Sequence, residues 1–350
     1  MRYIELFAGI GGFRNAADHL SLDTDRQFEC VAFSEIDHHA KTTYSANYNI
    51  ADEVQMNDII NFTDDKENIR KLPDFNLLLG GFPCQAFSLL GKQLGLEDER
   101  GKILFSIHEI LKGKQPEFVV LENVRNIINH DKGKTLELII NFFKEHEYKY
   151  VNYVVLDTQS FGLPQRRSRI FFVCSKKEIE IELTEEAIVN NFNNIDYHSL
   201  NTYTNVLDIL ERETNQKYYL SEKIKHTILD GGSKNFWSKS QIDLDIARTL
   251  TATMVKMHRA CQDNYYSDDY ILNGQSHKET AKEVLFKKPV RRLTPPEALK
   301  LQGFDQPFFD NAIAAGVSEH QLYKQAGNAL SVNTGYALLH YLFVRLRIQD

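Results

Sequence analysis

Short apolar runs alternate with amphipathic segments along the first half of the chain. The apolar runs are rich in β-branched residues and cover residues 2–7, 29–35, 76–81, 118–122, 150–156 and 169–174. Between two of them, residues 132–147 place Leu136, Ile139, Ile140 and Phe143 at helical spacing. An alternation of strands with crossover helices is typical of a parallel sheet covered by helices. The first half therefore predicts an α/β domain.

The pattern changes after about residue 176. Residues 176–201 are polar and rich in Asn, and the chain that follows mixes short strand-like pieces with turns at Gly232 and Gly274. Residues 333–347 return to a strongly amphipathic helix that would suit the sheet of the first domain. Such a change indicates a domain boundary. We expect one domain from residues 1–180 plus 320–350, and a smaller mixed domain from residues 181–319.

Composition and charge exclude several classes of protein. The 350 residues are 42% hydrophobic and 25% charged, as in an ordinary soluble globular chain. No apolar run reaches the roughly 18 residues of a membrane span, and the N-terminus lacks the layout of an export signal, so we expect a cytoplasmic location. The four Cys residues are too widely spaced for a CxxC site, which predicts reduced thiols and no bound metal. The net charge of -7 argues against electrostatic coating of nucleic acid and leaves a local basic face possible.

A glycine-rich turn follows the first apolar run. It contains Phe7, Gly9, Ile10 and Gly11, and a helical pattern begins directly after it. Glycines let the backbone approach a ligand closely, and the following helix offers free N–H groups. Glu35 comes about 23 residues later, near the spacing at which an acid binds ribose hydroxyls. The pattern FxGxGG, rather than GxGxxG, favours an adenosine-containing cofactor without phosphates over NAD. A plain tight turn with a solvated Glu is the alternative.

Two further polar residues follow apolar runs. Cys84, in GGFPCQ, stands at the entry of a helix, whose dipole would favour a nucleophilic thiolate. Glu122 follows the adjacent strand, where it could donate a proton to a ring nitrogen. Because open α/β sheets bind ligands at the carboxyl ends of their strands, we expect Cys84 and Glu122 to converge. Taken singly, the alternatives are a small core cysteine and a capping or surface acid.

Arginines dominate the segment PQRRSR. In an extended chain, Arg167 and Arg169 point to one face, and Ser168 points to the other. Two guanidinium groups on one face could hold a carbonyl oxygen and a phosphate together. A solvated strand edge is the alternative.

Taken in order, FAGIGG, SEID, GGFPCQAFS, LENV, PQRRSR, RRLTPPEALKLQGF and QAGN closely resemble the DNA (cytosine-5)-methyltransferases of the bacterial and phage modification type. The resemblance covers nearly the whole chain except about residues 180–245 and 262–285. It implies a Rossmann-like, S-adenosylmethionine-dependent catalytic domain at 1–180 plus 320–350. A smaller mixed target-recognition domain with a hinge, inserted late in the chain, would then occupy residues 181–319.

The resemblance also implies a role for each site residue. Cys84 would be the nucleophile that adds to C6 of cytosine, and Glu122 the acid at N3 and the exocyclic amine. Arg169 would hold the base's O2, and Arg167 would support it or bind a phosphate. The implied cofactor contacts are Phe7, Gly9, Ile10 and Gly11, with Glu35 at the ribose, Ile36 at the adenine ring, Asp58 at the adenine amine and Asn328 at the methionine end. Many relatives have an aromatic residue where this chain has Ile36, and a hydroxyl residue where it has Ala329.

The implied reaction is methyl transfer from S-adenosylmethionine to C5 of cytosine in a specific double-stranded DNA sequence, through a covalent Cys84–C6 adduct. Because a stacked base conceals the face of its ring, the cytosine must be flipped out of the duplex. By analogy, the compact chain suggests a restriction-modification methylase. We expect a cognate restriction endonuclease in the same system without a stable complex, and neither a membrane nor a metal partner.

Three other functions are weighed against this one. A tRNA cytosine-5 methyltransferase would use the same catalytic motifs, but CQDNYY around Cys261 does not match the CFT-type signature of that branch. A catalytically idle DNA-binding relative would not need Cys84, Glu122 and Arg169 intact. A nicotinamide oxidoreductase would have no use for Cys84 or for QAGN.

The recognition region is the least readable part of the sequence. Residue types that suit phosphates and base edges occur at Lys234, Trp237, Lys239, Lys256, His258, Arg259, Tyr265 and Tyr266. Residues 278–300 carry seven Lys or Arg against three Glu, which predicts a basic wall facing DNA. An ordinary solvated surface is the alternative.

Overall fold

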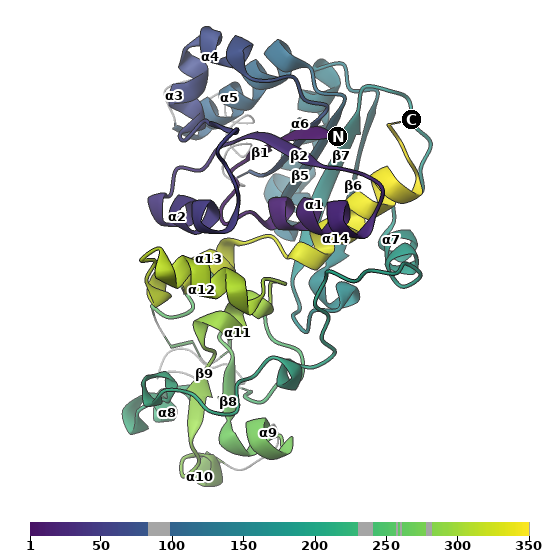
Figure 1. The fold of residues 1–350 in the computed structure, drawn as a ribbon. Helices are drawn as coiled ribbons and strands as arrows, with labels where there is room; N and C mark the ends of the chain where they lie inside the picture. The colour runs from purple at the N-terminus through teal and green to yellow at the C-terminus, as the bar shows by residue number, and fades with distance from the viewer. Residues whose placement is uncertain (83–98, 230–240, 257, 260, 278–281, 350) are drawn as a thin grey trace. The chain divides into compact units, whose positions relative to one another are not determined.

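The computed structural model describes residues 1–349 except 83–98, 230–240, 257, 260 and 278–281 (Figure 1). The chain divides into two compact units. Unit 1 consists of Met1–Asp157, Ser168–Leu200 and Thr334–Asp350, and unit 2 consists of Thr158–Arg167 and Asn201–Asn333. The chain therefore leaves unit 1 twice and returns to it twice.

Unit 1 is built on a seven-stranded sheet. Its strands are β1 (Arg2–Leu6), β2 (Glu29–Phe33), β3 (Val54–Gln55), β4 (Leu77–Gly81), β5 (Phe118–Val124), β6 (Tyr150–Asp157) and β7 (Ser168–Ser175). They lie in the order β3-β2-β1-β4-β5-β7-β6. The six predicted strands are confirmed to within two residues at each end. β3 was not predicted, because two residues are too few to give an apolar pattern.

One strand departs from the predicted parallel arrangement. The neighbours from β3 through β5 pair in parallel, but β7 runs antiparallel to both β5 and β6. Only η4 (Thr158–Phe161) and a short loop separate β6 from β7, and this connection is too short for the crossover that parallel strands need. The Rossmann-like α/β class is confirmed, with this antiparallel strand as its exception.

Helices accompany the sheet along the chain. They are α1 (Gly12–Asp23), α2 (His38–Asn47), α3 (Ile59–Asp64), α4 (Lys66–Lys71), α5 (Glu99–Lys114), η2 (Arg125–Ile128), η3 (His130–Gly133), α6 (Lys134–Glu145), α7 (Glu185–Phe192), α14 (Val332–Leu339) and the π-helix η7 (His340–Arg345). α6 lies within the predicted helix and buries Ile139 and Phe143 completely. Among the described residues, no helix combines the length and the apolar character that crossing a bilayer requires.

The core of unit 1 lies between the sheet and the helices that follow its strands. Ile4, Leu78 and Val119 from three neighbouring strands pack in one cluster with Ile107 of α5 and Phe143 of α6. All five side chains are fully buried. Burial on this scale fixes the strands, and it therefore fixes the polar residues that follow their carboxyl ends.

Unit 2 has a mixed and less regular structure. Its elements are η5 (Val206–Asp208), η6 (Gln216–Tyr218), α8 (Glu222–Leu229), β8 (Tyr265–Ser267), α9 (Asp268–Asn273), α10 (Lys282–Leu285), β9 (Val290–Arg292), α11 (Pro295–Lys300), α12 (Gln306–Ala314) and α13 (Glu319–Asn328). β8 and β9 form a two-stranded antiparallel sheet. A capping box starts α11, because the Thr294 hydroxyl accepts from the N–H of Glu297 while the Glu297 carboxylate accepts from the N–H of Thr294.

The boundaries of the units differ from the predicted domain limits of 180/181 and 319/320. Residues 181–200 stay with unit 1, where the Ser199 hydroxyl donates to Asp23 at 2.7 Å. α13 belongs to unit 2, where the Tyr323 hydroxyl donates to the Leu293 carbonyl at 2.5 Å. The Asn-rich composition after residue 176 marks surface chain, and surface chain does not by itself mark the end of a unit.

Candidate active site

The turn between β1 and α1 has left-handed backbone at three residues. The φ angles are 55° at Phe7, 58° at Gly9 and 83° at Gly11. A Cβ atom on Gly9 would meet no described heavy atom within 4 Å, so open space adjoins the turn there. A Cβ on Gly11 would lie 2.5 Å from the Tyr48 ring, and the Tyr48 hydroxyl donates to the carbonyls of Ile10 and Gly11 at 3.3 and 2.9 Å. The absence of a side chain at Gly11 thus lets the Tyr48 ring pack against the turn, and Gly9 leaves room for a ligand.

Glu35 is bound to this same turn. Its carboxylate accepts from the N–H of Gly9 at 2.8 Å and from the N–H of Asp37 at 2.7 Å. Burial raises the pKa of Glu35, and these two N–H groups partly oppose the rise. A carboxylate has about four acceptor positions, so capacity for further hydrogen bonds remains. The neighbouring Ile36 side chain is 75% exposed and offers apolar surface beside the carboxylate.

Asp58 lies at the same edge of the sheet as Glu35. β3 pairs in parallel with β2, with Gln55 opposite Phe33, so the residues after both strands emerge on one side. The Asp58 side chain caps α3 by accepting from the N–H of Ile60 at 2.9 Å, and it also accepts from the Asn61 amide at 2.8 Å. Glu35 therefore contacts the glycine turn directly, and the register places Asp58 after β3 at the same edge of the sheet.

A buried charged cluster beneath the turn was not predicted. Glu5 in β1 is 2% exposed, and Arg14 in α1 forms ion pairs with Asp18, at 3.0 Å, and with Glu53. Burial raises the pKa of Glu5 to about 8, while the charge of Arg14 and the backbone N–H groups of Arg14 and Phe13 act against the rise. The first turn of α1 therefore faces a carboxyl group of the protein itself. The available sequence signal was an acid inside the apolar run 2–7.

The paired ends of β4 and β5 are shaped by two glycines. A Cβ on Gly80 would lie 2.6 Å from the Leu6 carbonyl oxygen, so glycine permits the close pairing of β4 with β1. Gly81 stands opposite Glu122 in the parallel register of β4 and β5. A Cβ on Gly81 would lie 3.3 Å from Glu122 Oε2, so the carboxylate lies directly over this glycine.

The chain after β4 is anchored by Asn123. Its side-chain amide donates to the Phe82 carbonyl at 2.8 Å, and its amide oxygen accepts from the N–H of Val124. Asn123 is 2% exposed, so this link is shielded from water. Cys84, two residues after Phe82, lies outside the described residues. The predicted convergence of Cys84 with Glu122 therefore stays a prediction.

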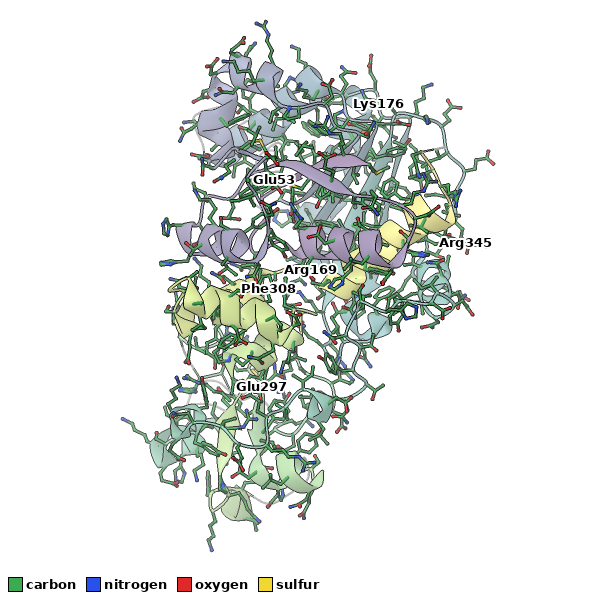
Figure 2. All side chains as sticks on the ribbon, viewed as in Figure 1. Glu53, Arg169, Lys176, Glu297, Phe308 and Arg345 are labelled. Atoms are coloured by element: carbon green, nitrogen blue, oxygen red, sulfur yellow. The ribbon has the colours of Figure 1, made fainter. Side chains whose placement is uncertain are left out.

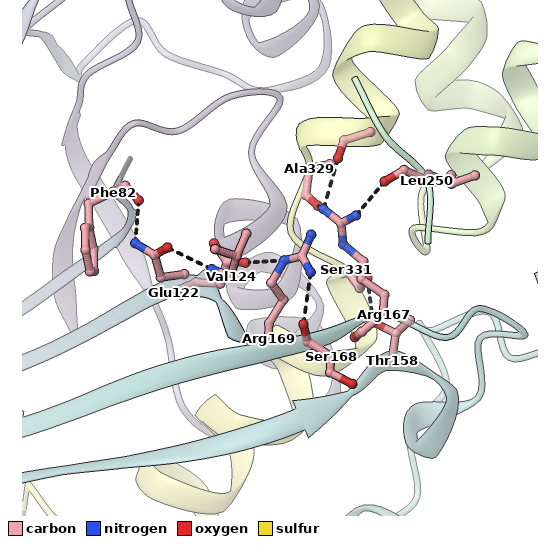
Figure 3. A network of polar contacts seen from close by, with 12 residues as sticks. Phe82, Glu122, Val124, Thr158, Arg167, Ser168, Arg169, Leu250, Ala329 and Ser331 are labelled. Carbon is pink, nitrogen blue, oxygen red and sulfur yellow. Dashed lines mark hydrogen bonds and ion pairs between the residues drawn. The ribbon is translucent and has the colours of Figure 1, made fainter. Parts of the chain in front are cut away.

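Glu122 and Arg169 form an ion pair at the edge of the sheet (Figure 3). Arg169 Nε lies 2.8 Å from Glu122 Oε1, and the two side chains are 15% and 16% exposed. Arg169 stands opposite Val124 in the antiparallel register of β5 and β7, so it reaches Glu122 two residues along the neighbouring strand. The same guanidinium donates to the Ser168 carbonyl at 2.9 Å. The antiparallel strand β7 thus places the Arg169 guanidinium beside the Glu122 carboxylate of β5.

Arg167, which is expected to support Arg169 or bind a phosphate, lies among backbone carbonyls. It belongs to unit 2, is 2% exposed, and donates to the carbonyls of Leu250, Gly327 and Ala329 at 3.0, 3.1 and 2.8 Å (Figure 3). Both terminal nitrogens of the guanidinium thus donate to backbone carbonyls inside unit 2. Its position therefore points to a role inside unit 2.

Asn328 is the last residue of α13, in unit 2. Its side chain is exposed, while Gly327 and Ala329 on either side are buried. The N–H of Ala329 donates to the Gln325 carbonyl at 2.8 Å, which closes the last turn of the helix. The arrangement presents one polar amide from an otherwise buried helix end.

Several residues expected to meet DNA lie elsewhere. Tyr265 and Tyr266 are 2% and 0% exposed, because β8 packs them into unit 2, so the expectation of base contacts is wrong for both. Lys234, Trp237 and Lys239 lie outside the described residues. His258 borders an open pocket of unit 2 that is also lined by Thr249, Leu250, Thr251, Met254 and Arg292.

The predicted basic wall at residues 278–300 is wrong at its centre. Arg291 is 1% exposed and binds Glu297, which is fully buried and labelled in Figure 2. Lys288 pairs with Asp269 at 2.7 Å. These charges stabilise the interior and flank of unit 2 and do not form an open cationic surface.

Within the described ranges, no group of three or more His, Cys, Asp or Glu residues is arranged to hold a metal ion. The candidate site is therefore built from a glycine turn with two carboxylates near it, and from an acid–guanidinium pair on the neighbouring strands.

The sequence matches one protein family along almost its whole length. The family model described as C-5 cytosine-specific DNA methylase matches residues 1–343. The type II methyltransferase M1.ScrFI of Lactococcus lactis subsp. cremoris is 35% identical over 339 residues, which cover 96% of this chain and 76% of that protein. The type II methyltransferase M.HhaI of Haemophilus parahaemolyticus is 29% identical over 338 residues, which cover 95% of this chain and 91% of that protein.

Solved structures share the fold. The Entamoeba histolytica methyltransferase EhMeth aligns with a TM-score of 0.75 and 22% identity, over 99% of this chain and 98% of that chain. The S. pombe Dnmt2 methyltransferase aligns with a TM-score of 0.74 and 19% identity, over 99% of each chain. At this level of identity the likeness concerns the fold.

Proposed function

Because the chain belongs to the family of C-5 cytosine-specific DNA methylases, we propose that it transfers a methyl group from S-adenosylmethionine to C5 of cytosine within a specific double-stranded DNA sequence. The observation that carries this proposal is the contact of Glu122 with Arg169, 2.8 Å apart at the edge from which β4 leads on to Cys84. A carboxyl group and a guanidinium side by side match the two polar edges of cytosine, N3 with its amine and O2.

The chemistry assigns each residue one task. C5 of cytosine is a poor nucleophile until the thiolate of Cys84 bonds to C6 and Glu122 gives a proton to N3. The Glu122 carboxylate, ionised in its pair with Arg169, takes up this proton from solvent before the transfer. The electron pair then lies on C5 as an enamine. S-adenosylmethionine, when bound, supplies the electrophilic methyl carbon for it. The methyl transfer leaves S-adenosylhomocysteine. The C5 proton then passes to a solvent water, the C5–C6 double bond reforms as Cys84 leaves as thiolate, and N3 returns its proton to Glu122.

Arg169 holds the base during these steps. Its guanidinium donates to O2, so the cytosine lies with N3 toward Glu122. The attack needs the open face of the ring, and the cytosine must therefore leave the base stack and enter the site as a flipped nucleotide. In the absence of DNA, the ion pair with Glu122 holds the guanidinium at this edge of the sheet.

The cofactor is proposed to occupy the glycine turn. Phe7 and the segment from Gly9 to Gly11 line it, Glu35 accepts from the ribose hydroxyls, and Ile36 packs on the adenine. Asp58 accepts from the adenine amine, and Asn328 binds the methionine end. The open space beside Gly9 and the 75% exposure of Ile36 support this assignment.

The buried acid beneath the turn favours a cofactor without phosphates. Helix N-termini bind phosphate through free N–H groups and the helix dipole. At the first turn of α1, the N–H groups of Phe13 and Arg14 already interact with the Glu5 carboxyl. A dinucleotide would place its pyrophosphate against this carboxyl, whereas the sulfonium cofactor carries no phosphate.

We infer that the methylation protects DNA within a restriction-modification system. Relatives named type II methyltransferases cover most of this chain. A cognate endonuclease would recognise the same sequence and would need no stable complex with the methylase.

The experiment that tests the proposal is a transfer assay with labelled S-adenosylmethionine. Unmethylated duplex DNA and tRNA are offered separately, and the labelled DNA is mapped by bisulfite sequencing. We expect label in C5 of cytosine within one duplex sequence. Label in tRNA alone contradicts the assignment of DNA as the substrate. The absence of label in both DNA and tRNA contradicts the proposed methyltransferase activity.

The covalent step has a test of its own. Cys84→Ala should abolish transfer and leave DNA binding largely intact. A duplex with 5-fluorocytosine at the target should form an irreversible adduct with the unchanged chain, because fluorine cannot leave as a proton does. Turnover by Cys84→Ala, or no adduct with an active chain, contradicts the covalent mechanism.

A further inference from the structure

A single buried side chain joins two segments of unit 2 that are distant in sequence. Arg167 Nη1 donates to the Leu250 carbonyl at 3.0 Å, and Nη2 donates to the carbonyls of Gly327 and Ala329 at 3.1 and 2.8 Å (Figure 3). Leu250 is the centre of the segment 249–251, and Gly327 and Ala329 flank Asn328 on either side. The guanidinium therefore fixes the backbone on both sides of Asn328 relative to the segment 249–251.

The two segments also contact each other directly. A Cβ atom on Gly327 would lie 2.2 Å from the Thr251 carbonyl carbon and 2.3 Å from the Ala252 nitrogen. No side chain fits at such a distance, so glycine is required for the contact. The backbone of α13 thus meets the chain at residues 251–252, and neither segment can shift alone.

A second side chain fixes the other polar group of Leu250. The Gln165 amide oxygen accepts from the N–H of Leu250 at 2.9 Å, and its amide nitrogen donates to the Leu301 carbonyl at 2.9 Å. Gln165 is fully buried. Both backbone polar groups of Leu250 therefore bond to buried side chains, the carbonyl to Arg167 and the N–H to Gln165.

The two joined segments both present groups to open space. Thr249, Leu250 and Thr251 line the open pocket of unit 2 together with His258 and Arg292. The Asn328 side chain is exposed at the end of α13. Under the proposed function, the segment 249–251 belongs to the unit that recognises DNA, and Asn328 binds the methionine end of the cofactor.

We propose that Arg167 is a positioning residue that couples cofactor binding to DNA binding, because it holds the segment 249–251 and the two neighbours of Asn328 in one arrangement. This inference rests on the proposed function. Cofactor that orders Asn328 also orders residues 249–251 through the shared guanidinium. DNA then binds without paying the conformational entropy of ordering residues 249–251, so its affinity increases. By linkage, bound DNA increases the affinity for cofactor by the same factor.

The test measures the affinity for duplex DNA with and without saturating S-adenosylhomocysteine. We expect the unchanged chain to bind its DNA about tenfold more tightly with the nucleoside present, within the usual range of coupling between two sites. In Arg167→Met this ratio should fall to near one, because methionine fills space but donates no hydrogen bond. Arg167→Lys should restore only part of the ratio, since an ammonium cannot match the planar fork that spans three carbonyls.

Arg248→Met is the matched control. Arg248 also donates to two backbone carbonyls of unit 2, those of Asp263 and Gln241, at 3.2 and 3.0 Å. Neither carbonyl belongs to the helix end that carries Asn328. This variant should lose thermal stability and keep the ratio of the unchanged chain. A merely structural role of Arg167 would likewise lower the melting temperature without changing the ratio.

Gly327→Ala keeps the proposal testable if Arg167→Met does not fold. The added methyl group must separate residues 251–252 from α13, so the ratio should again fall toward one. An unchanged ratio in a folded Arg167 or Gly327 variant overturns the coupling, and so does a ratio of one in an unchanged chain that methylates DNA. An unchanged chain that methylates no DNA instead contradicts the proposed function.

Discussion

Two arginine–glutamate pairs, one in each unit, use the same side chains in different ways. In unit 1, Arg169 Nε lies 2.8 Å from Glu122 Oε1, and the side chains are 15% and 16% exposed. In unit 2, Arg291 binds Glu297 through two nitrogens at 2.7 and 2.9 Å, and the side chains are 1% and 0% exposed. The first pair can be reached by a ligand, and the second pair is sealed in the core.

The difference lies in how completely the backbone supports each pair. The Glu297 carboxylate also accepts from the N–H groups of Glu211 and Thr294, at 2.7 and 2.6 Å, and Arg291 donates to the Glu211 carbonyl at 2.9 Å. A buried pair persists only when its remaining polar positions are satisfied in this way. A partly exposed pair needs less support, and it can exchange its partner for a substrate. The buried pair in unit 2 organises the fold, and the partly exposed pair in unit 1 is available for chemistry.

Glu122→Gln should cause the largest loss of function with almost no loss of stability. An amide keeps the shape of the side chain, but it has no carboxyl proton to give to N3. We expect the single-turnover rate of methyl transfer to fall by about 10³-fold, in the range for a general acid. The free energy of unfolding should change by less than about 1 kcal/mol, because the amide oxygen can still accept a hydrogen bond from Arg169.

Urea unfolding of both proteins provides the control for this substitution. A rate within tenfold of the unchanged chain would show that Glu122 is no acid. A large loss of stability would remove the contrast between the two pairs.

Glu297→Ala should have the opposite profile. It leaves the Arg291 guanidinium buried without its carboxylate, which typically costs about 3–5 kcal/mol of folding free energy. The free energy of unfolding from denaturant titration checks this value. At a temperature where the variant is folded, kcat should stay within a few-fold of the unchanged chain.

The double variant Arg291→Met with Glu297→Leu is the matched control. Two apolar side chains of similar volume leave no unpaired charge, so much of the lost stability should return. If Glu297→Ala unfolds at the same denaturant concentration as the unchanged chain, the pair is not structural. The comparison with Glu122 then has no basis.

Glu5→Gln tests a buried acid that has less support than Glu297. No described residue hydrogen-bonds to Glu5 Oε2, and burial raises the pKa of Glu5 to about 8 from an ordinary value of 4.5. Between these values the folded chain holds a proton that the unfolded chain releases. The free energy of unfolding should therefore fall as the pH rises, by at most about 1.4 kcal/mol per pH unit for this one group.

Glutamine stays neutral, so the variant lacks this contribution. Its stability relative to the unchanged chain should increase as the pH is raised from about 5 to about 8, and chemical unfolding at several pH values measures the difference. A difference that is constant with pH would show that Glu5 ionises in the folded chain as it does in the unfolded one.

The strands and the edge that carries Glu122 were predictable because their signals are local. An apolar run followed at once by a polar residue marks the carboxyl end of a buried strand, and this pattern gave the positions of Glu35 and Glu122 after β2 and in β5. Arg169 instead stands at the start of the apolar run that forms β7. The position of each of these residues depends on the strand to which it is joined in sequence. Their chemical roles depend on groups from other strands, and these roles came from the resemblance to a family.

Burial of charge was not predictable for the opposite reason. Arg291 has the sequence context of a surface cation in a basic stretch. Its burial depends on the carboxylate of Glu297, six residues away, and on the carbonyl of Glu211, 80 residues away. Arg167 also reads as an exposed clamp, and its carbonyl partners come from 83 to 162 residues further along the chain. The sequence shows the charged residue, but it does not show the distant backbone carbonyl that hydrogen-bonds to it.

Gly81→Ala should give the smallest effect and test the geometry of the exposed pair without touching its charges. The backbone of Gly81 is extended strand, so alanine brings no conformational strain there, and the unfolding free energy should be unchanged or slightly higher. Its Cβ would lie 3.3 Å from Glu122 Oε2, so the carboxylate must move by a few tenths of an ångström. Misplacement on this scale should lower kcat about tenfold and leave the cofactor KM unchanged, because acid catalysis depends on position.

Gly80→Ala is the control, since its Cβ would lie 2.6 Å from the Leu6 carbonyl oxygen and should weaken the sheet itself. Full kcat in Gly81→Ala would mean that the position of Glu122 is not critical, and the role of the exposed pair would then rest on its charge alone.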